Sequence, residues 1–426
     1  MNQSRKSKFN VMFIITSMPV GGAETLLVNM IRRMDPARCK PHICCLKDKD
    51  VLGEEIEGEF PIYSNLIRHK MDVGIIGRIK NLIRKHEIDA VITVGAGDKM
   101  FWGRLAAKRS RVPVILSALH STGWPDGVGR MNRMLTPITD GFIAVAENHG
   151  HYQVEQEKFP REKVFVIPNG VDTDRFQLDS VKRQQWRQMI GIPQDVPAVG
   201  IVAALRSEKN HELFLNVAAS VNKTMPETQF VIAGDGPSKD ELEKLASQLG
   251  IAEQTHLLGS VSDIPGVLSA IDLFALTSDN EASPVSILEA MSCSLPVVST
   301  DVGSVSQSVI EGRTGFLVPT GEVAPAAEAW LKVLQSPQLA KSMGQQGREH
   351  VISYSSLDSM TESYVDLIDG LYHRKMSKAE DTPELERLSI NWYDGQSAEA
   401  EASTEPTIPQ LPVTTPTIST NAPAER

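Results

Sequence analysis

The segment Ser283-Pro284-Val285-Ser286 has the residue types that begin a helix and bind an anion. Serine is a preferred helix N-cap and proline suits the first helical position, so we predict a helix that begins at Pro284. The first N–H groups of a helix have no partner inside it, and the helix dipole adds about half a positive charge there. We therefore expect the N–H groups of Val285 and Ser286 to bind a phosphate group.

Two carboxylates flank this predicted phosphate site. Glu281 comes just before the helix, and Glu289 lies five residues into it, roughly 7.5 Å along the axis. A diphosphate with a hydroxyl-rich sugar on each side would suit this arrangement, and a nucleotide sugar is such a molecule. The alternative is that both glutamates are ordinary surface charges, because this spacing also arises by chance.

These residues, taken with other segments, resemble the E-x7-E signature of the GT4 family of retaining glycosyltransferases. The resemblance covers nearly all of residues 9–372. It implies a GT-B fold and transfer of a sugar from a nucleotide-diphosphate sugar. The other matching segments are Gly21-Gly22-Ala23-Glu24, Asn169-Gly170-Val171-Asp172, Val231-Ile-Ala-Gly-Asp-Gly-Pro237, Leu258-Gly-Ser260, Asp301-Val-Gly303 and Thr314-Gly-Phe-Leu-Val-Pro319.

The resemblance also implies catalytic roles for four residues. Glu281 would hold hydroxyls of the donor sugar, and His120 would reach that sugar near the reacting carbon. Lys209 would neutralise the diphosphate. The family usually has an arginine five residues before this lysine, but this chain has Ala204, so we expect Arg206 to fill the same space.

Further residues are implied to bind the donor. Glu289 would hold the ribose, and two glycine-containing loops would approach the phosphates and the nucleotide closely because glycine has no Cβ. The predicted donor-binding residues are Gly21, Gly22, Gly234, Asp235, Gly236, Ser283, Pro284, Val285, Ser286 and Glu289. Two alternatives remain. The departure at Ala204 suggests a non-catalytic nucleotide-sugar-binding or scaffold subunit of a glycan-synthesis complex, and the other is a different GT-B enzyme, such as a nucleotide-sugar epimerase or a phosphorylase.

The elements that would position these residues alternate between strands and helices. Strand runs that are apolar throughout are typical of parallel sheets covered on both faces. This predicts an α/β chain with two doubly wound, Rossmann-like parallel-sheet domains that face a cleft. Predicted strands are 10–16, 41–46, 90–94, 112–116, 141–145, 163–167, 198–203, 228–232, 255–258, 273–276 and 295–299. Predicted helices are 23–34, 210–224, 238–249, 264–270, 284–293 and 357–372.

We predict four parts along the chain. Residues 1–175 form an acceptor-side domain, and residues 176–355 form the nucleotide-sugar-binding domain. Residues 356–376 form a terminal helix that packs back towards the first domain. Residues 377–426 are rich in Glu, Ser, Thr and Pro and are predicted to be disordered. An apolar island at 388–393 is interpreted as a patch in a linker, with a docking peptide as the alternative.

The composition excludes several other classes. The 426 residues contain no apolar run near the ~20 residues that span a bilayer. No export signal is recognised, so we expect a cytoplasmic protein. The cysteines lack the spacing of a zinc site or a disulfide framework, so we expect them to be small buried apolar residues. They are Cys39, Cys44, Cys45 and Cys293. For the transfer that the resemblance implies, we expect neither a metal nor a cofactor, because the nucleotide sugar is a substrate. The net charge is −10, and we expect no nucleic-acid partner.

The acceptor is suggested only by charge. Basic residues exceed acidic ones up to residue 170, although the whole chain is acidic. The segment 78–85 places Ile79, Leu82 and Ile83 among basic residues and could rest on an anionic membrane surface. We expect a UDP- or GDP-sugar as the donor. A lipid-linked or polysaccharide acceptor would explain the excess of basic residues. The alternative is a solvated helix whose apolar stripe packs on the sheet. Further basic residues are Arg104, Lys108, Arg109 and Arg111.

Overall fold

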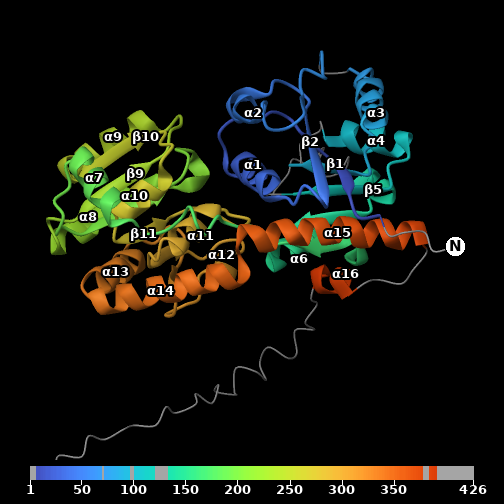
Figure 1. Cartoon of the computed structure of the whole chain (residues 1–426). Coiled ribbons are helices and arrows are strands. Elements are labelled where there is room, and N and C mark those ends of the chain that lie inside the picture. Colours follow the sequence, from blue (N-terminus) through green and yellow to red (C-terminus); the bar gives the residue numbers. More distant parts are fainter. Residues whose placement is uncertain (1–5, 70–71, 96–99, 120–132, 378–382, 391–426) are drawn as a thin grey trace, which may run out of the picture. The chain divides into compact units, whose positions relative to one another are not determined.

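A computed structural model describes residues 6–69, 72–95, 100–119, 133–377 and 383–390 (Figure 1). These residues form two parallel β-sheets, each with its own hydrophobic core. The first sheet has seven strands in the order β3-β2-β1-β4-β5-β6-β7, and the second has six in the order β10-β9-β8-β11-β12-β13. The two doubly wound sheets confirm the predicted fold class.

The first sheet is built around β1, whose seven residues are nearly all buried. Helices cover such a sheet on both faces, which is why its strands are apolar throughout. The strands are β1 Phe9–Ile15, β2 Cys39–Cys45, β3 Ile62–Tyr63, β4 Ala90–Val94, β5 Val114–Ala118, β6 Gly141–Ala144 and β7 Val164–Val166. The helices are α1 Gly22–Arg33, α2 Asp50–Ile56, α3 Ile75–Lys85, α4 Met100–Ser110 and α6 Glu147–Glu155, with short 3₁₀ turns η1 Thr136–Ile138 and η2 Arg161–Lys163.

The second sheet is built around β8 and β11. Its strands are β8 Ala198–Val202, β9 Gln229–Ala233, β10 Thr255–Gly259, β11 Leu273–Leu276, β12 Val297–Thr300 and β13 Gly315–Val318. Its helices are α7 Ser180–Ile190, α8 His211–Thr224, α9 Lys239–Gln248, α10 Ile264–Ala270, α11 Val285–Ser292, α12 Val305–Ser308, α13 Val323–Leu334 and α14 Pro337–Tyr354, with 3₁₀ turns η3 Ser207–Lys209 and η4 Ala252–Gln254. The strand order reverses between β8 and β11, and open α/β sheets bind ligands at such a point.

All eleven predicted strands exist, most of them shifted by one or two residues. Two strands were missed. The strand β3 has only two residues, and β13 begins with Gly315 inside a segment with a turn-like composition. Both lie at the ends of their sheets, where a strand needs a neighbour on one side only.

The helix α15, Leu357–Ser377, shares the core of the first sheet. Its apolar residues Tyr364, Leu367 and Ile368 are buried in one cluster with residues of β1 and α1. The chain therefore returns to the first sheet after completing the second.

The expectation of a disordered tail from residue 377 is wrong for residues 383–390. They form α16, Pro383–Leu388, which packs beside α15 and continues into an antiparallel bridge between Ser389 and Phe165 (Figure 1). Leu385, Leu388 and Ile390 are buried, so the apolar island begins with core residues rather than a free patch. Residues 391–426 lie outside the described residues.

The basic segment 78–85 belongs to α3, and its apolar stripe faces the core. Ile79 and Ile83 are buried, which supports the packing alternative and excludes their insertion into a membrane. Arg104 is also buried, so it adds nothing to a basic surface. The exposed Arg84 and Lys85 lie in the last turn of α3, where cations stabilise the negative end of the helix dipole.

The four cysteines are unpaired and buried, as expected of small apolar residues. Burial raises the pKa of Cys39 to about 11 and that of Cys293 to about 12, so both thiols stay protonated. No helix among the described residues combines the length and apolar character needed to cross a bilayer.

Candidate functional site

The loops after β8 and β11 meet where the strand order of the second sheet reverses. Asp279 donates its backbone N–H to the carbonyl oxygen of Glu208 at 2.9 Å, and its side chain accepts a bond from Asn210 Nδ2 at 2.9 Å. Thr277 Oγ1 donates to the carbonyl oxygen of Asn210 at 3.0 Å. The two loops therefore form one connected surface at the carboxyl edge of the sheet.

Glu281 lies at the centre of this surface and is 8% exposed. One carboxylate oxygen, Oε1, accepts a bond from Lys209 Nζ at 2.6 Å and another from Ser278 Oγ at 2.7 Å. Both contacts use the same oxygen, so they fix the carboxylate without engaging Oε2. The structure thus brings together two predicted catalytic residues, Glu281 and Lys209. Ser278, which supports them, was not predicted.

Gly303 packs closely against the backbone of Glu281. Its φ of 59° lies in the left-handed region, and a Cβ placed there would lie 1.5 Å from the carbonyl oxygen of Glu281. Only glycine permits this approach. The sequence showed the Asp301-Val-Gly303 segment only as a family match, because nothing local indicates which backbone the glycine would contact.

The helix α11 begins at Val285, one residue later than predicted. Pro284 is the N-cap with φ −73° and ψ 116°, and no side chain caps the helix, so the prediction of Ser283 as N-cap is wrong. A residue before proline is held in extended conformation, which keeps Ser283 out of the first turn. Val285 and Ser286 remain at the helix start, where N–H groups have no partner inside the helix.

Glu289 lies on α11 and is partly buried. Burial raises the pKa of its carboxyl from 4.5 to about 7, and the charge of Arg175 opposes that rise. Arg175 is the last residue of the predicted acceptor-side domain and was not predicted as a site residue. Its position beside Glu289 depends on the path of the linker, which no local pattern reveals.

The segment Gly234-Asp235-Gly236 packs against the loop that follows β8. A Cβ on Gly234, where φ is 154°, would lie 1.9 Å from the carbonyl oxygen of Ala203, and one on Gly236 would lie 2.5 Å from that of Leu205. These contacts bring the predicted nucleotide-side loop against the loop that carries Lys209.

Arg206 is not held in the site. Its side chain is 66% exposed, and its nearest ion-pair partner is Glu208 at 3.9 Å. Ala204 leaves the position of the usual family arginine without a cation. The expectation that Arg206 replaces that arginine stays a prediction.

In the first sheet, Gly21 and Gly22 lie where the chain enters α1 after β1. Gly22 is the first residue of α1, and Gly21 is its N-cap in extended conformation. A Cβ on Gly21 would lie 2.5 Å from Glu24 Oε2, so glycine makes room for that carboxylate. Burial raises the pKa of Glu24. His120, the fourth predicted catalytic residue, lies outside the described residues.

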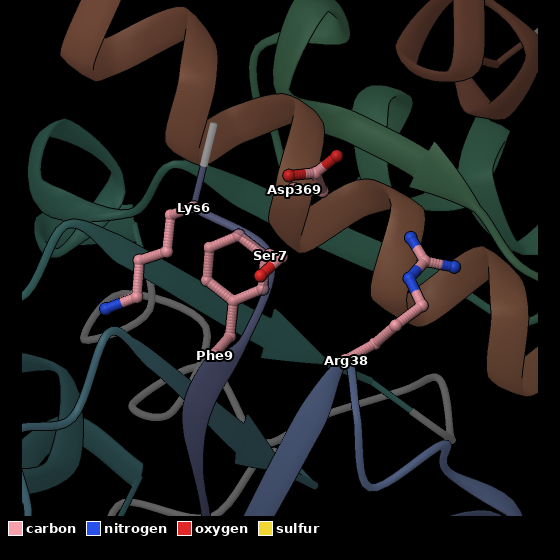
Figure 2. Close-up of a pocket in the computed structure, with 5 residues that line it drawn as sticks. All are labelled: Lys6, Ser7, Phe9, Arg38 and Asp369. Atoms are coloured by element: carbon pink, nitrogen blue, oxygen red, sulfur yellow. The ribbon is translucent and has the colours of Figure 1, made fainter. Parts of the chain in front are cut away.

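A cavity of about 240 Å³ lies elsewhere, beside the amino end of β1 (Figure 2). Its cations already have partners, because Lys6 Nζ lies 2.5 Å from Asp89 and Arg38 lies 3.0 Å from Asp366. Ligands of parallel sheets bind at the carboxyl edge, so this cavity is separate from the candidate site. It is lined by Lys6, Ser7, Phe9, Arg38 and Asp369.

Two Rossmann-like sheets, with a helix start placed between two carboxylates and a lysine at the switch point, define a class of enzyme that transfers sugars from nucleotide donors. The family model for "Glycosyl transferases group 1" matches residues 182–350, and that for "Glycosyltransferase Family 4" matches residues 20–175. The chain belongs to this glycosyltransferase family.

Three curated relatives are similar in sequence over most of their length. The putative glycosyltransferase EpsF of Bacillus subtilis is 27% identical over 73% of this chain and 83% of its own. Alpha-D-kanosaminyltransferase of Streptomyces kanamyceticus is 33% identical over 59% of this chain and 69% of its own. A GDP-mannose-dependent alpha-(1-6)-phosphatidylinositol monomannoside mannosyltransferase of Mycolicibacterium smegmatis is 27% identical over 64% of this chain and 74% of its own.

A solved structure has the same fold. The crystal structure of Anabaena Alr3699/HepE in complex with UDP superimposes with a TM-score of 0.75 at 21% identity. The match covers 84% of this chain and 99% of that one. It shows that both sheets and their connections belong to one known architecture.

Proposed function

We propose that this chain is a retaining glycosyltransferase that moves a sugar from a UDP- or GDP-sugar to a lipid-linked or polysaccharide acceptor in cell-surface glycan synthesis. The observation that carries the proposal is the pairing of Glu281 with Lys209 at 2.6 Å beside the start of α11. A carboxylate for sugar hydroxyls and a cation for phosphate are thereby held together at a helix end that favours anions.

The donor is proposed to lie along the start of α11. Its diphosphate accepts N–H bonds from Val285 and Ser286 and is neutralised by Lys209. The donor sugar binds Glu281, and the ribose binds Glu289 on the other side. The loop Gly234-Asp235-Gly236 lines the nucleotide side, and Gly21-Gly22 approaches the phosphates from the first sheet.

The reaction breaks the bond between the anomeric carbon and the diphosphate oxygen. The acceptor oxygen bonds to the same carbon on the same face, and its proton passes to the departing phosphate oxygen. Preorganised N–H groups and Lys209 stabilise the charge that develops on the diphosphate. Arg206, which is 66% exposed, is proposed to swing towards the diphosphate and join them. His120 is proposed to lie near the reacting carbon. No metal is required for this sequence of steps.

The acceptor proposal is supported by relatives and by charge. By its name, the Mycolicibacterium smegmatis relative acts on phosphatidylinositol monomannoside, a lipid. The exposed cations Lys108, Arg109 and Arg111 could attract an anionic surface without apolar insertion. We propose a cytoplasmic enzyme that contacts the inner face of the membrane peripherally. Liposome binding at low salt that weakens with added salt would support this contact, and no binding at low salt would refute it.

A thermal-shift panel of UDP-, GDP- and ADP-sugars tests the donor proposal without knowledge of the acceptor. Stabilisation by UDP- or GDP-sugars is expected, because a ligand that binds the folded state raises the unfolding temperature. The preferred donor is then incubated with candidate lipid and glycan acceptors in the presence of EDTA, and the product anomer is assigned by NMR.

The outcomes separate the possibilities. Transfer with the anomeric configuration retained supports the proposal, whereas inversion refutes the mechanism. Loss of transfer in EDTA refutes the metal-free step. Binding without turnover on any acceptor indicates a nucleotide-sugar-binding subunit. Absence of stabilisation by every nucleotide sugar contradicts the donor proposal.

A further inference from the structure

The linker between the two sheets contacts the start of α11. Asn169 is only 5% exposed, and its Nδ2 donates a hydrogen bond to the carbonyl oxygen of Ser283 at 2.9 Å. That carbonyl belongs to the peptide joined to Pro284, the N-cap of α11. In the sequence, Asn169 stands out only as part of a segment that matches the family.

The same linker also contacts the end of α11. The carbonyl oxygen of Phe176 accepts bonds from Ser292 Oγ at 2.7 Å and from Arg348 Nη1 at 3.0 Å. Arg348 also donates to the carbonyl oxygens of Ser292 and, at 3.2 Å, of Thr173. Residues 169–176 therefore hold both ends of the helix that begins the candidate phosphate site.

The linker is itself fixed by the junction between α14 and α15. Val171 donates its N–H to the carbonyl oxygen of Ser355 at 2.9 Å and accepts a bond from the N–H of Leu357 at 2.9 Å. A Cβ on Gly170 would lie 2.7 Å from the carbonyl oxygen of Ser356. Asn169 is thus anchored by the residues that directly follow it.

We propose that Asn169 is a positioning residue for the diphosphate-binding amides of α11. The inference rests on the proposed function. Pro284 has no N–H, and Ser283 does not cap the helix, so the helix start lacks the usual side-chain restraint. The bond from Asn169 orients the planar peptide before Pro284 and, through it, the N–H groups of Val285 and Ser286. Donors held in place before binding stabilise phosphate charge best.

The test compares Asn169→Ala with Asn216→Ala. Asn216 also donates to a backbone carbonyl in the second domain, at 2.8 Å to Glu212, but this exposed bond lies within α8 and contacts neither α11 nor the linker. Calorimetric titration measures the dissociation constants of UDP and UMP, and of GDP and GMP, for the full-length wild type and both variants. Hydrogen exchange measured by mass spectrometry follows the peptide that spans residues 283–292.

We expect Asn169→Ala to weaken diphosphate binding about tenfold, to weaken monophosphate binding by less than threefold, and to speed exchange in 283–292. Asn216→Ala should change none of these. Equal weakening of both nucleotides, or unchanged diphosphate binding with unchanged exchange, would overturn the positioning role. Wild-type protein that binds none of the four nucleotides would instead refute the proposed function. If Asn169→Ala does not fold, Asn169→Ser is measured and judged by the same criteria.

Discussion

Glu281 is the residue on which the proposed chemistry depends most. Its carboxylate accepts two bonds through one oxygen, from Lys209 and from Ser278, which leaves the other oxygen for a sugar hydroxyl. The residue types and spacing predicted this carboxylate, and the family resemblance predicted its lysine. They did not predict Ser278, because a serine at the end of a strand has no pattern that distinguishes it from other loop serines.

Glu281→Ala is expected to lower kcat at least a hundredfold while the protein stays folded, because it removes the proposed contact to the reacting sugar. The steady-state rate of transfer, or of donor hydrolysis if no acceptor is known, measures the loss. Glu241→Ala, at an exposed position on α9, is the control. Full activity of the Glu281 variant would remove this residue from the mechanism.

Glu289 should make the free protein less stable as the pH rises from about 4.5 to 7. Burial raises the pKa of its carboxyl to about 7, whereas the same group in the unfolded chain titrates near 4.5. The unfolded chain loses this proton first, so stability from this group is present below pH 4.5 and is lost by about pH 7.

Glu289→Gln removes this titration and is expected to raise the unfolding temperature at pH 8 more than at pH 4.5. The difference in unfolding free energy should be on the order of 1–3 kcal/mol. Thermal unfolding of the nucleotide-free protein at both pH values measures it, with Glu241→Gln as the control. An equal shift at the two pH values would show that the Glu289 carboxyl is not perturbed by burial.

At the scale of elements, the loop that contains Gly303 packs against the loop that carries Glu281. Gly303 and Gly321 both have left-handed backbones, but only Gly303 faces another backbone, since a Cβ on Gly321 would meet nothing within 4 Å. Alanine substitutions at these two glycines therefore separate the effect of backbone strain, which both share, from the effect of the close approach to Glu281.

Gly321→Ala is expected to cost about 1–2 kcal/mol of stability and to leave activity intact. Gly303→Ala should cost more and also lower activity, because the loop that carries Glu281 must move. Thermal unfolding and the transfer rate check both effects. Similar stability and activity in the two variants would contradict the close packing of Gly303 against the backbone of Glu281.

The helix α16 is the element that sequence analysis missed most clearly. The polar composition of residues 377–426 predicted disorder, but a few apolar side chains suffice to order a short helix where another helix offers a surface to pack on. Gly370 provides such a surface, because a Cβ there would lie 2.7 Å from Leu385. The local sequence of α16 cannot reveal the packing surface, because that surface lies on another helix.

Leu385→Ala is expected to cost about 2–4 kcal/mol, as for other fully buried leucines. Leu178→Ala, at a position where the leucine is 55% exposed, should have little effect. Thermal unfolding of the full chain measures both. Equal stability of the Leu385 variant and the wild type would show that α16 does not pack against α15.

At the scale of the whole molecule, apolar runs predicted the two parallel sheets because each central strand is buried on both faces. The order of the strands then places the loops after β8 and β11 together, which local patterns suggest but cannot demonstrate. Contacts that join distant segments were not predictable. The linker bond from Asn169 to Ser283 and the electrostatic effect of Arg175 on the Glu289 carboxyl both depend on the path of the chain between domains.

The most direct measurement is a crystal structure of the chain with bound UDP or GDP. We expect the diphosphate oxygens to lie within hydrogen-bond distance of the Val285 and Ser286 amides, and the ribose hydroxyls to contact Glu289. A nucleotide bound away from the start of α11, or bound there with Glu289 turned away from it, would contradict the proposed donor site.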